Sequence, residues 1–157
     1  MVVHNIDPIY DNDSRILILG SFPSVKSREI QFFYGHPQNR FWKIMEILYD
    51  TRLNSIEDKK DFLHNQHIAL WDVIQSCEIR GSSDASITNV AVNDISKILE
   101  ASHIESIYTN GGKAYQLYNK YIYKDTLMKA ISLPSTSPAN ARYSLDDLIQ
   151  SWKIIKL

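Results

Sequence analysis

The feature that most constrains the fold of this chain is a set of four short, largely apolar runs, each followed at once by a residue common in turns. The runs cover residues 16–19, 68–71, 106–109 and 128–133, and the residues that follow them are Gly20, Asp72, Asn110 and Pro134. Short runs without polar alternation are typical of strands buried on both faces, as in parallel sheets.

Helical patterns separate these runs. Apolar residues recur at helical spacing within 41–48, 95–99, 114–121 and 145–152, and Ser144 with Asp147 three residues later predicts a capped start for the last helix. Parallel strands need crossover connections, so the alternation predicts an α/β fold, a three-layer α/β/α sandwich with a mostly parallel four-stranded central sheet. At 157 residues the chain has the length of one domain, and we expect residues 1–157 to form a single domain.

Ligands of open parallel sheets bind beyond the carboxyl ends of the strands, so chemistry is expected in the segments that begin at the four turn residues. Two connections lack any periodic pattern, residues 21–39 and 75–93. Long connections of this kind inside a compact domain are usually functional.

Composition narrows the class of protein. The chain is 44% hydrophobic and 22% charged, shows no apolar run long enough to span a membrane and no visible signal peptide, so a soluble cytoplasmic protein is expected. The single cysteine, Cys77, excludes an internal disulfide and a four-cysteine or iron–sulfur cluster, and no histidine pair has metalloprotease spacing, so no metal or cofactor is expected. With a net charge of −1, any nucleic-acid binding needs locally clustered positive charge.

Two segments carry unusual residue combinations. Gly20-Ser21-Phe22-Pro23-Ser24 follows the first run, and an aromatic and polar stretch at 34–42 precedes a helix, in which Phe41 and Trp42 are interpreted as core residues. The second segment, residues 133–140, places small hydroxyl residues between two prolines. Such a turn is either an ordinary surface turn without a ligand or one that presents backbone N–H groups to a phosphate or a base edge.

Together these stretches resemble the uracil-DNA glycosylase superfamily. The resemblance rests on Gly-x-x-Pro after the first strand, His-Pro-x-Asn-Arg-Phe-Trp after it, and the Pro/Ser-rich turn after the last strand. Residues 69–74, with Cys77, Arg80-Gly81-Ser82 and Asp84 after them, and residues 135–140 resemble the hypoxanthine-removing branch most closely. The resemblance implies a monomeric enzyme, associated with the nucleoid, that flips a damaged nucleotide out of DNA and hydrolyses its N-glycosidic bond without a cofactor.

The resemblance also implies roles for individual residues in the base pocket. Tyr34 stands where relatives stack an aromatic ring on the base. The alternative interpretation is an ordinary loop tyrosine without contact to a ligand. Asp72 would accept the N1–H of hypoxanthine, or else act as a cap or ion-pair partner. The remaining base-binding candidates are Ser21, Phe22 and Ser135.

Phe22 stands where relatives carry the asparagine that activates water, so the usual catalytic group is missing. In the hypoxanthine branch this role falls to the asparagine of the His-Pro-x-Asn stretch, here Asn39. An amide cannot deprotonate water, so Asn39 would position it. Asn39 is alternatively an N-cap of the following helix.

Contacts to the DNA backbone are expected from Ser24, Lys26, Arg40, Ser137, Asn140 and Arg142. A local basic face would combine Lys26, Arg40 and Arg142 with Arg28 and Lys113, although isolated surface charges often have no role. Ala139 stands where several relatives carry a bulky wedge that fills the gap left by the flipped base. A uracil or mismatch glycosylase and a non-catalytic nucleic-acid-binding relative remain the alternative functions.

Overall fold

A computed structural model describes residues 1–157. Its central sheet has four strands in the order β3-β2-β6-β7, with every neighbouring pair parallel. Their bounds are β2 (Ile16–Gly20), β3 (Ile68–Asp72), β6 (Ser106–Asn110) and β7 (Ala130–Leu133). The predicted parallel four-stranded sheet is confirmed, and only its last strand begins two residues later than expected.

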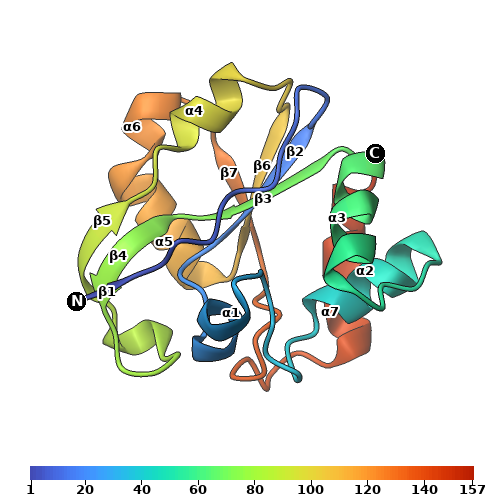
Figure 1. Ribbon diagram of the computed structural model, residues 1–157, viewed down its shortest axis with the longest axis horizontal. Coiled ribbons are helices and arrows are strands. Elements are labelled where there is room, and N and C mark those ends of the chain that lie inside the picture. Colours follow the sequence, from blue (N-terminus) through green and yellow to red (C-terminus); the bar gives the residue numbers. More distant parts are fainter.

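Helices cover both faces of this sheet (Figure 1). One face carries α2 (Phe41–Tyr49), α3 (Ile56–Asn65) and α7 (Leu145–Trp152), and the other carries α4 (Ile95–Glu100), α5 (Gly112–Tyr121) and α6 (Tyr123–Thr126). The four predicted helices are present, and the Ser144 side chain and Asp147 form the expected capping box of α7. Helix α3 was not predicted, because it buries only Phe62 and Leu63 and its apolar pattern is correspondingly weak.

A second sheet was not predicted either. It joins β1 (Val2–Val3), β4 (Ile74–Glu78) and β5 (Thr88–Val92), all antiparallel, and β4 and β5 lie where the sequence indicates a long connection. Two register shifts interrupt the β4–β5 pairing, and β5 is a largely exposed edge strand, so the period of two is lost in the sequence. A 3-10 turn, η1 (Asp84–Ser86), links these two strands.

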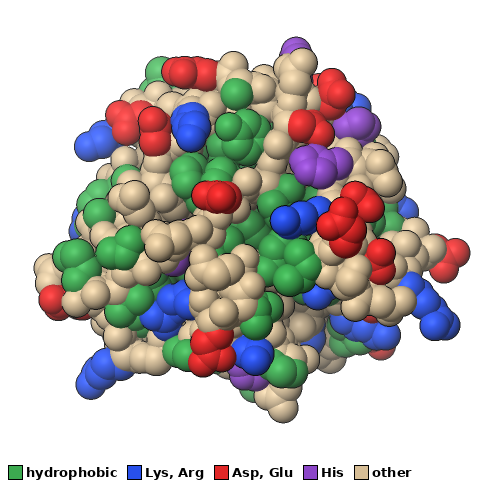
Figure 2. All heavy atoms as spheres, viewed as in Figure 1, with side chains coloured by type: hydrophobic (Ala, Val, Ile, Leu, Met, Phe, Trp, Pro, Cys, Tyr) green, Lys and Arg blue, Asp and Glu red, His purple; other side chains and the backbone are tan.

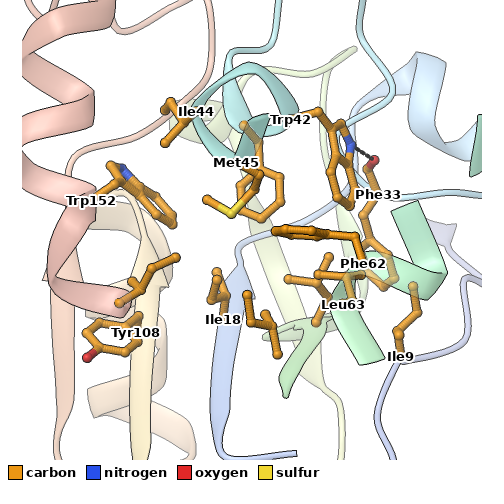
Figure 3. Packing of buried hydrophobic residues seen from close by; sticks show 14 of the residues in the cluster. Ile9, Ile18, Phe33, Trp42, Ile44, Met45, Phe62, Leu63, Tyr108 and Trp152 are labelled. Atoms are coloured by element: carbon orange, nitrogen blue, oxygen red, sulfur yellow. Dashed lines mark hydrogen bonds between the residues drawn. The ribbon is translucent and has the colours of Figure 1, made fainter. Parts of the chain in front are cut away.

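Two apolar clusters hold the layers together. Along β2, Ile16 and Ile18 belong to the cluster beneath α2, α3 and α7, whereas Leu17 and Leu19 belong to the cluster on the opposite face. In the first cluster Trp42 and Phe41 are buried, as predicted, and the Trp42 indole donates to the Phe33 carbonyl (3.0 Å, Figure 3). Each fully buried side chain of this size contributes about 2–3 kcal/mol through burial.

The surface view in Figure 2 shows acidic and basic side chains interspersed on one face, with hydrophobic side chains between them. None of the helices is long and apolar enough to cross a membrane. No three or more His, Cys, Asp or Glu side chains gather where they could hold a metal ion.

Candidate active site

A cavity of about 1010 Å³ opens where the four parallel strands end. This volume is at the upper end of the range for small-molecule sites and is sufficient for a nucleoside. The residues predicted for the site that line the cavity are Ser21, Phe22, Ser24, Tyr34, Asn39, Asp72, Ser135, Ser137 and Asn140. Lys26, Arg40 and Arg142 lie outside the lining.

Asn39 lies immediately before α2 and is half-buried. Its side-chain oxygen Oδ1 accepts a hydrogen bond from the backbone N–H of Phe41 (2.9 Å) and another from the hydroxyl of Thr136 (2.8 Å). The residue at the N-cap position is Arg40, which makes no side-chain capping bond. The structure therefore gives Asn39 a role at the start of the helix while also placing it on the cavity wall.

Thr136 connects Asn39 to the end of β6. Its backbone N–H donates to Asn110 Oδ1 (3.0 Å), and its hydroxyl accepts from Asn110 Nδ2 (3.0 Å). Thr136 is fully buried, and Asn110 is nearly so. Three residues far apart in the sequence, Asn39, Asn110 and Thr136, are thus joined by two side-chain amides and one hydroxyl.

Tyr34 packs one face of its ring against Phe41, with ring centroids 4.2 Å apart. Tyr34 is also one of the residues that line the cavity. The Tyr34 hydroxyl is buried and makes no hydrogen bond of good geometry, and the side-chain amide of Asn110 close to it only partly offsets the rise of its pKa. Burial, followed by the negative field of Asp72, raises the pKa of this hydroxyl far above its usual range.

Gly20, the last residue of β2, permits this arrangement. A Cβ at position 20 would lie 2.5 Å from Asp72 Oδ1 and 3.3 Å from the Tyr34 hydroxyl. Cβ atoms do not approach other heavy atoms so closely, and a side chain here would displace the carboxylate. The missing Cβ is therefore what lets Asp72 and Tyr34 meet at the floor of the cavity.

Asp72 ends β3 and is almost completely buried. Its backbone carbonyl accepts from Asn93 (2.9 Å), while its Oδ2 atom has no hydrogen-bond partner. Burial first, and then the negative charge of Asp84, raises the pKa of Asp72 to about 7. Asp72 thus lines the cavity, while its unpartnered Oδ2 atom is buried on the side of His4.

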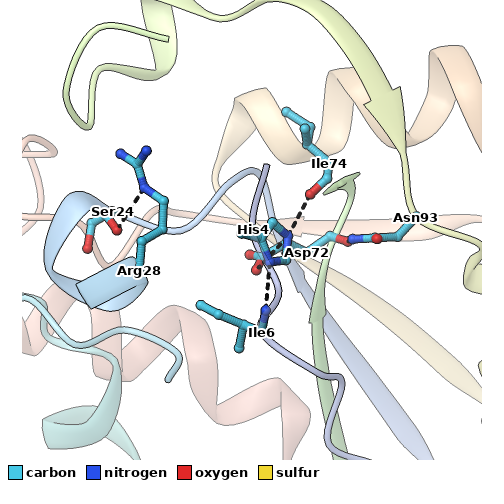
Figure 4. A network of polar contacts seen from close by, with 7 residues as sticks. All are labelled: His4, Ile6, Ser24, Arg28, Asp72, Ile74 and Asn93. Carbon is cyan, nitrogen blue, oxygen red and sulfur yellow. Dashed lines mark hydrogen bonds and ion pairs between the residues drawn. The ribbon is translucent and has the colours of Figure 1, made fainter. Parts of the chain in front are cut away.

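His4 lies beside Asp72 without forming a hydrogen-bonded ion pair (Figure 4). Its Nε2 donates to the Ile74 carbonyl (2.8 Å), its Nδ1 accepts from the N–H of Ile6 (3.3 Å), and Nε2 lies 3.9 Å from Asp72 Oδ2. An Nδ1 that accepts belongs to a neutral ring, and burial lowers the pKa of His4 in agreement. His4 therefore does not neutralise Asp72.

Another part of the cavity lining comes from Ser21, Phe22 and the connection between β4 and β5. The Ser21 hydroxyl donates to Asp84 Oδ1 (2.9 Å), an exposed carboxylate whose pKa is raised by partial desolvation against the opposing effects of Ser21 and Lys113. Phe22 is buried, lies edge-on to His4 and carries the Arg28 guanidinium 5.4 Å from its ring centre.

The turn at residues 135–140 is tied internally. Ser135 Oγ accepts from the N–H of Ser137 (3.1 Å), Ser137 Oγ accepts from the N–H of Ala139 (3.1 Å), and the Asn140 amide donates to the Ser135 carbonyl (2.9 Å). Arg40 holds the same turn, because its guanidinium donates to the carbonyls of Ser137, Asn140 and Tyr143. Arg40 was predicted to contact DNA, but these guanidinium donors bind carbonyl groups of the protein itself.

The other predicted backbone contacts differ in their surroundings. Ser24 caps the short helix α1 (Val25–Ile30) by accepting from the N–H of Ser27, and Lys26 lies 3.9 Å from Glu29 as a partner on the same helix. Arg28 binds the carbonyl of Gly81 (2.8 Å). Arg142 is exposed, and in the sequence it lies between Asn140 and Tyr143, which line the cavity.

Several site residues were not assigned a role from sequence. Asn110 ends the third strand and was visible as a strand-end residue, and Thr136 lies within the predicted second segment. His4, which follows β1, lies beside Asp72 and had no signal in the sequence. Asp84, in the turn between β4 and β5, lines the cavity and was visible only as part of the family resemblance. The sequence did not predict the second sheet, and it is this sheet that brings both residues close to the ends of the parallel strands.

Comparison with known proteins agrees with this geometry. The chain is 34% identical over 149 residues to a hypoxanthine DNA glycosylase of Methanosarcina acetivorans, with 92% of both chains covered. It is 32% identical over 110 residues to a hypoxanthine DNA glycosylase of Methanosarcina barkeri, covering 68% of this chain and 70% of the relative.

A solution NMR structure of a candidate uracil DNA glycosylase from Methanosarcina acetivorans superposes with a TM-score of 0.84 at 32% identity, covering 99% of this chain and 96% of the other. The model of the uracil DNA glycosylase superfamily matches residues 8–156. With fold and sequence in agreement over nearly its whole length, the chain belongs to the uracil DNA glycosylase superfamily.

Proposed function

We propose that this protein is a DNA-deoxyinosine glycosylase that removes hypoxanthine from DNA and leaves an abasic site. The observation that carries the proposal is the position of Asn39 on the cavity wall, combined with the apolar Phe22 in the place of the usual catalytic residue. The names of the two Methanosarcina relatives support the same substrate.

In the proposed reaction the flipped base stacks on Tyr34, and its N1–H donates to the carboxylate of Asp72, both of which line the cavity. Ser21 and Ser135 complete the base contacts. Hypoxanthine offers an N–H where adenine has a lone pair, so an acceptor at Asp72 favours the deaminated base. Phe22 forms an apolar wall of the same pocket.

Asn39 holds the attacking water near the sugar. The water oxygen bonds to C1′, the bond from C1′ to N9 breaks with its electron pair leaving on the base, and the proton lost by water is balanced by one gained by the base. The transition state has oxocarbenium character, so placement of the water matters more than its deprotonation. The cavity lining includes no lysine, which supports water over an amine as the nucleophile and a monofunctional enzyme.

DNA backbone contacts are proposed for Ser24, Ser137 and Asn140 at the cavity rim, with Lys26 and Arg142 as flanking positive charges. Arg40 acts in this proposal by holding the 135–140 turn. We further propose that a monomer acts on chromosomal DNA. Sedimentation of the purified protein with and without a duplex measures the stoichiometry.

The decisive experiment incubates the protein with duplexes containing deoxyinosine, deoxyuridine or deoxyxanthosine and separates the strands on a gel after alkali treatment. We expect cleavage of the deoxyinosine strand, with uracil removed more slowly or not at all, and no strand break without alkali. Intact deoxyinosine strands at high enzyme excess would overturn the proposal. Faster removal of uracil would instead assign the uracil or mismatch function.

A further inference from the structure

We propose that Thr136 is a positioning residue that fixes the side-chain amide of Asn39 with its Nδ2 group, a hydrogen-bond donor, facing the cavity. This inference rests on the proposed function, because Asn39 is the residue to which that function assigns the water. Thr136 is completely buried, and its hydroxyl is bonded within the protein on both sides. Its hydroxyl therefore acts on the reaction through the two amides that it binds, and of these Asn39 is the one to which the water is assigned.

The orientation of the amides follows from backbone groups, whose donors are unambiguous. The backbone N–H of Thr136 can only donate, so the Asn110 atom 3.0 Å away is the carbonyl oxygen. The other branch of that amide, Nδ2, must then donate to Thr136 Oγ1 at 3.0 Å. The hydroxyl proton is left to point at Asn39 Oδ1, 2.8 Å away.

A second backbone donor fixes Asn39 independently. The N–H of Phe41 lies 2.9 Å from the same Asn39 oxygen, so rotating the amide by 180° would set two donors against each other. Asn39 Nδ2 therefore occupies the other branch. That group has no hydrogen-bond partner in the protein and is not buried, and the residue lines the cavity.

The direction of this chain of bonds has a chemical consequence. A water at Asn39 Nδ2 accepts a hydrogen bond through its oxygen and keeps a second lone pair for the sugar carbon. Asn39 then takes no proton from the water, and its role is one of geometry. Loss of the Thr136 hydroxyl would leave the Asn39 amide with only the Phe41 contact and more rotational freedom.

A matched control lies next to Asn110. Thr109 is also completely buried, and its hydroxyl has no hydrogen-bond partner. Replacing either threonine by valine keeps the shape of the side chain and removes one buried hydroxyl. Only Thr136→Val breaks the connection to Asn39.

The first experiment measures the single-turnover rate of deoxyinosine cleavage at saturating enzyme, below the unfolding temperature of every variant. We expect Thr136→Val to be slower by roughly 10- to 100-fold, Thr136→Ser to recover most of that loss, and Thr109→Val to match the wild type. A Thr136→Val rate equal to that of Thr109→Val overturns the proposal. A Thr136→Ser rate as low as that of Thr136→Val does so as well.

A double-variant cycle separates positioning from a merely structural effect. If Thr136 acts through Asn39, adding Thr136→Val to Asn39→Ala causes no further loss of rate. A full multiplicative loss in the double variant would show that Thr136 acts elsewhere.

The donor itself is tested by Asn39→Asp, which keeps the accepting oxygen and exchanges the donor for a second acceptor. We expect this variant to be as slow as Asn39→Ala. A rate near that of the wild type would contradict the donor orientation.

An NMR readout distinguishes failure of this inference from failure of the proposed function. The side-chain amide signals of Asn39 should shift or broaden in Thr136→Val and stay unchanged in Thr109→Val, whichever base is cut. Unchanged signals in Thr136→Val refute the positioning role, whereas uncut DNA with the expected signal changes refutes only the glycosylase proposal.

Discussion

The two sides of the cavity differ in how completely their polar groups are paired. On the first side, here called the relay side (Asn39, Thr136 and Asn110), the buried oxygen and nitrogen atoms have partners, and backbone N–H groups set the directions. On the second side, here called the carboxylate side (Asp72 and Tyr34), a carboxylate oxygen and a hydroxyl are buried without partners.

The difference indicates a division of roles. A paired network holds its atoms in one geometry before the substrate arrives, which suits a group that must place a water. An unpaired buried acceptor costs stability in the empty protein, and a ligand that supplies a donor recovers that cost. In the proposed function the relay side therefore serves to place the water, and the carboxylate side to recognise the base.

The largest effect is expected on the relay side, from Asn39→Ala. The single-turnover rate of deoxyinosine cleavage should fall by roughly 100- to 1000-fold, because the water loses its holder. The free energy of unfolding should fall by only about 1 kcal/mol, since the N–H of Phe41 at the helix start loses its acceptor. Asn119→Ala, on the exposed face of α5, is the control, and a rate within a few-fold of it contradicts the assignment.

Asp72→Asn tests the carboxylate side through the pH dependence of stability. Asp72 has a pKa of about 7 in the folded protein against an ordinary value of 3.8, so the folded state binds this proton more tightly. The wild-type free energy of unfolding should therefore decrease as pH rises from about 4 to about 7 and then level off.

The Asp72→Asn variant lacks this titration. At pH 8 its free energy of unfolding should exceed that of the wild type by on the order of a few kcal/mol, and near pH 4 the two should differ little. Urea unfolding at several pH values gives the comparison. The exposed Asp125→Asn should follow the wild type. Parallel curves for Asp72→Asn and the wild type would mean that Asp72 is ionised in the empty protein at neutral pH.

Gly20→Ala disturbs the floor where the carboxylate side is assembled. The new Cβ would meet Asp72 Oδ1 at 2.5 Å, and moving a buried carboxylate should cost about 1–3 kcal/mol of unfolding free energy. Gly112→Ala is the control, because a Cβ there meets nothing within 4 Å. Equal stability of the two variants would show that Asp72 moves without cost.

The smallest effect is expected from Tyr34→Phe. Removing an unpaired buried hydroxyl should leave stability unchanged or raise it by up to about 1 kcal/mol, with the ring still present for stacking. Tyr118→Phe is the contrast, since its hydroxyl bonds to Thr126 and Met128 and its loss should destabilise. A destabilised Tyr34→Phe would reveal a partner for this hydroxyl.

Much of the fold was predictable because the buried parallel strands and their crossover helices leave strong periodic patterns. The strand ends at Gly20, Asp72 and Asn110 also locate the cavity edge, since each is marked by the change from apolar to turn-forming residues. The second sheet was missed because bulges and an exposed edge erase its pattern. Without that sheet, the position of His4 beside Asp72 and the hydrogen bond from Ser21 to Asp84 could not be predicted.

By itself, the sequence determined which segments meet at the carboxyl edge of the sheet, since apolar periodicity and strand ends are local properties. Only the tertiary structure decided how the polar groups there are paired. There Asn39 accepts from Thr136, Arg40 donates to carbonyls of the 135–140 turn, and Asp72 Oδ2 is buried without a partner. Hydrogen bonds between residues about a hundred positions apart depend on distances of a few tenths of an ångström, which no local pattern encodes.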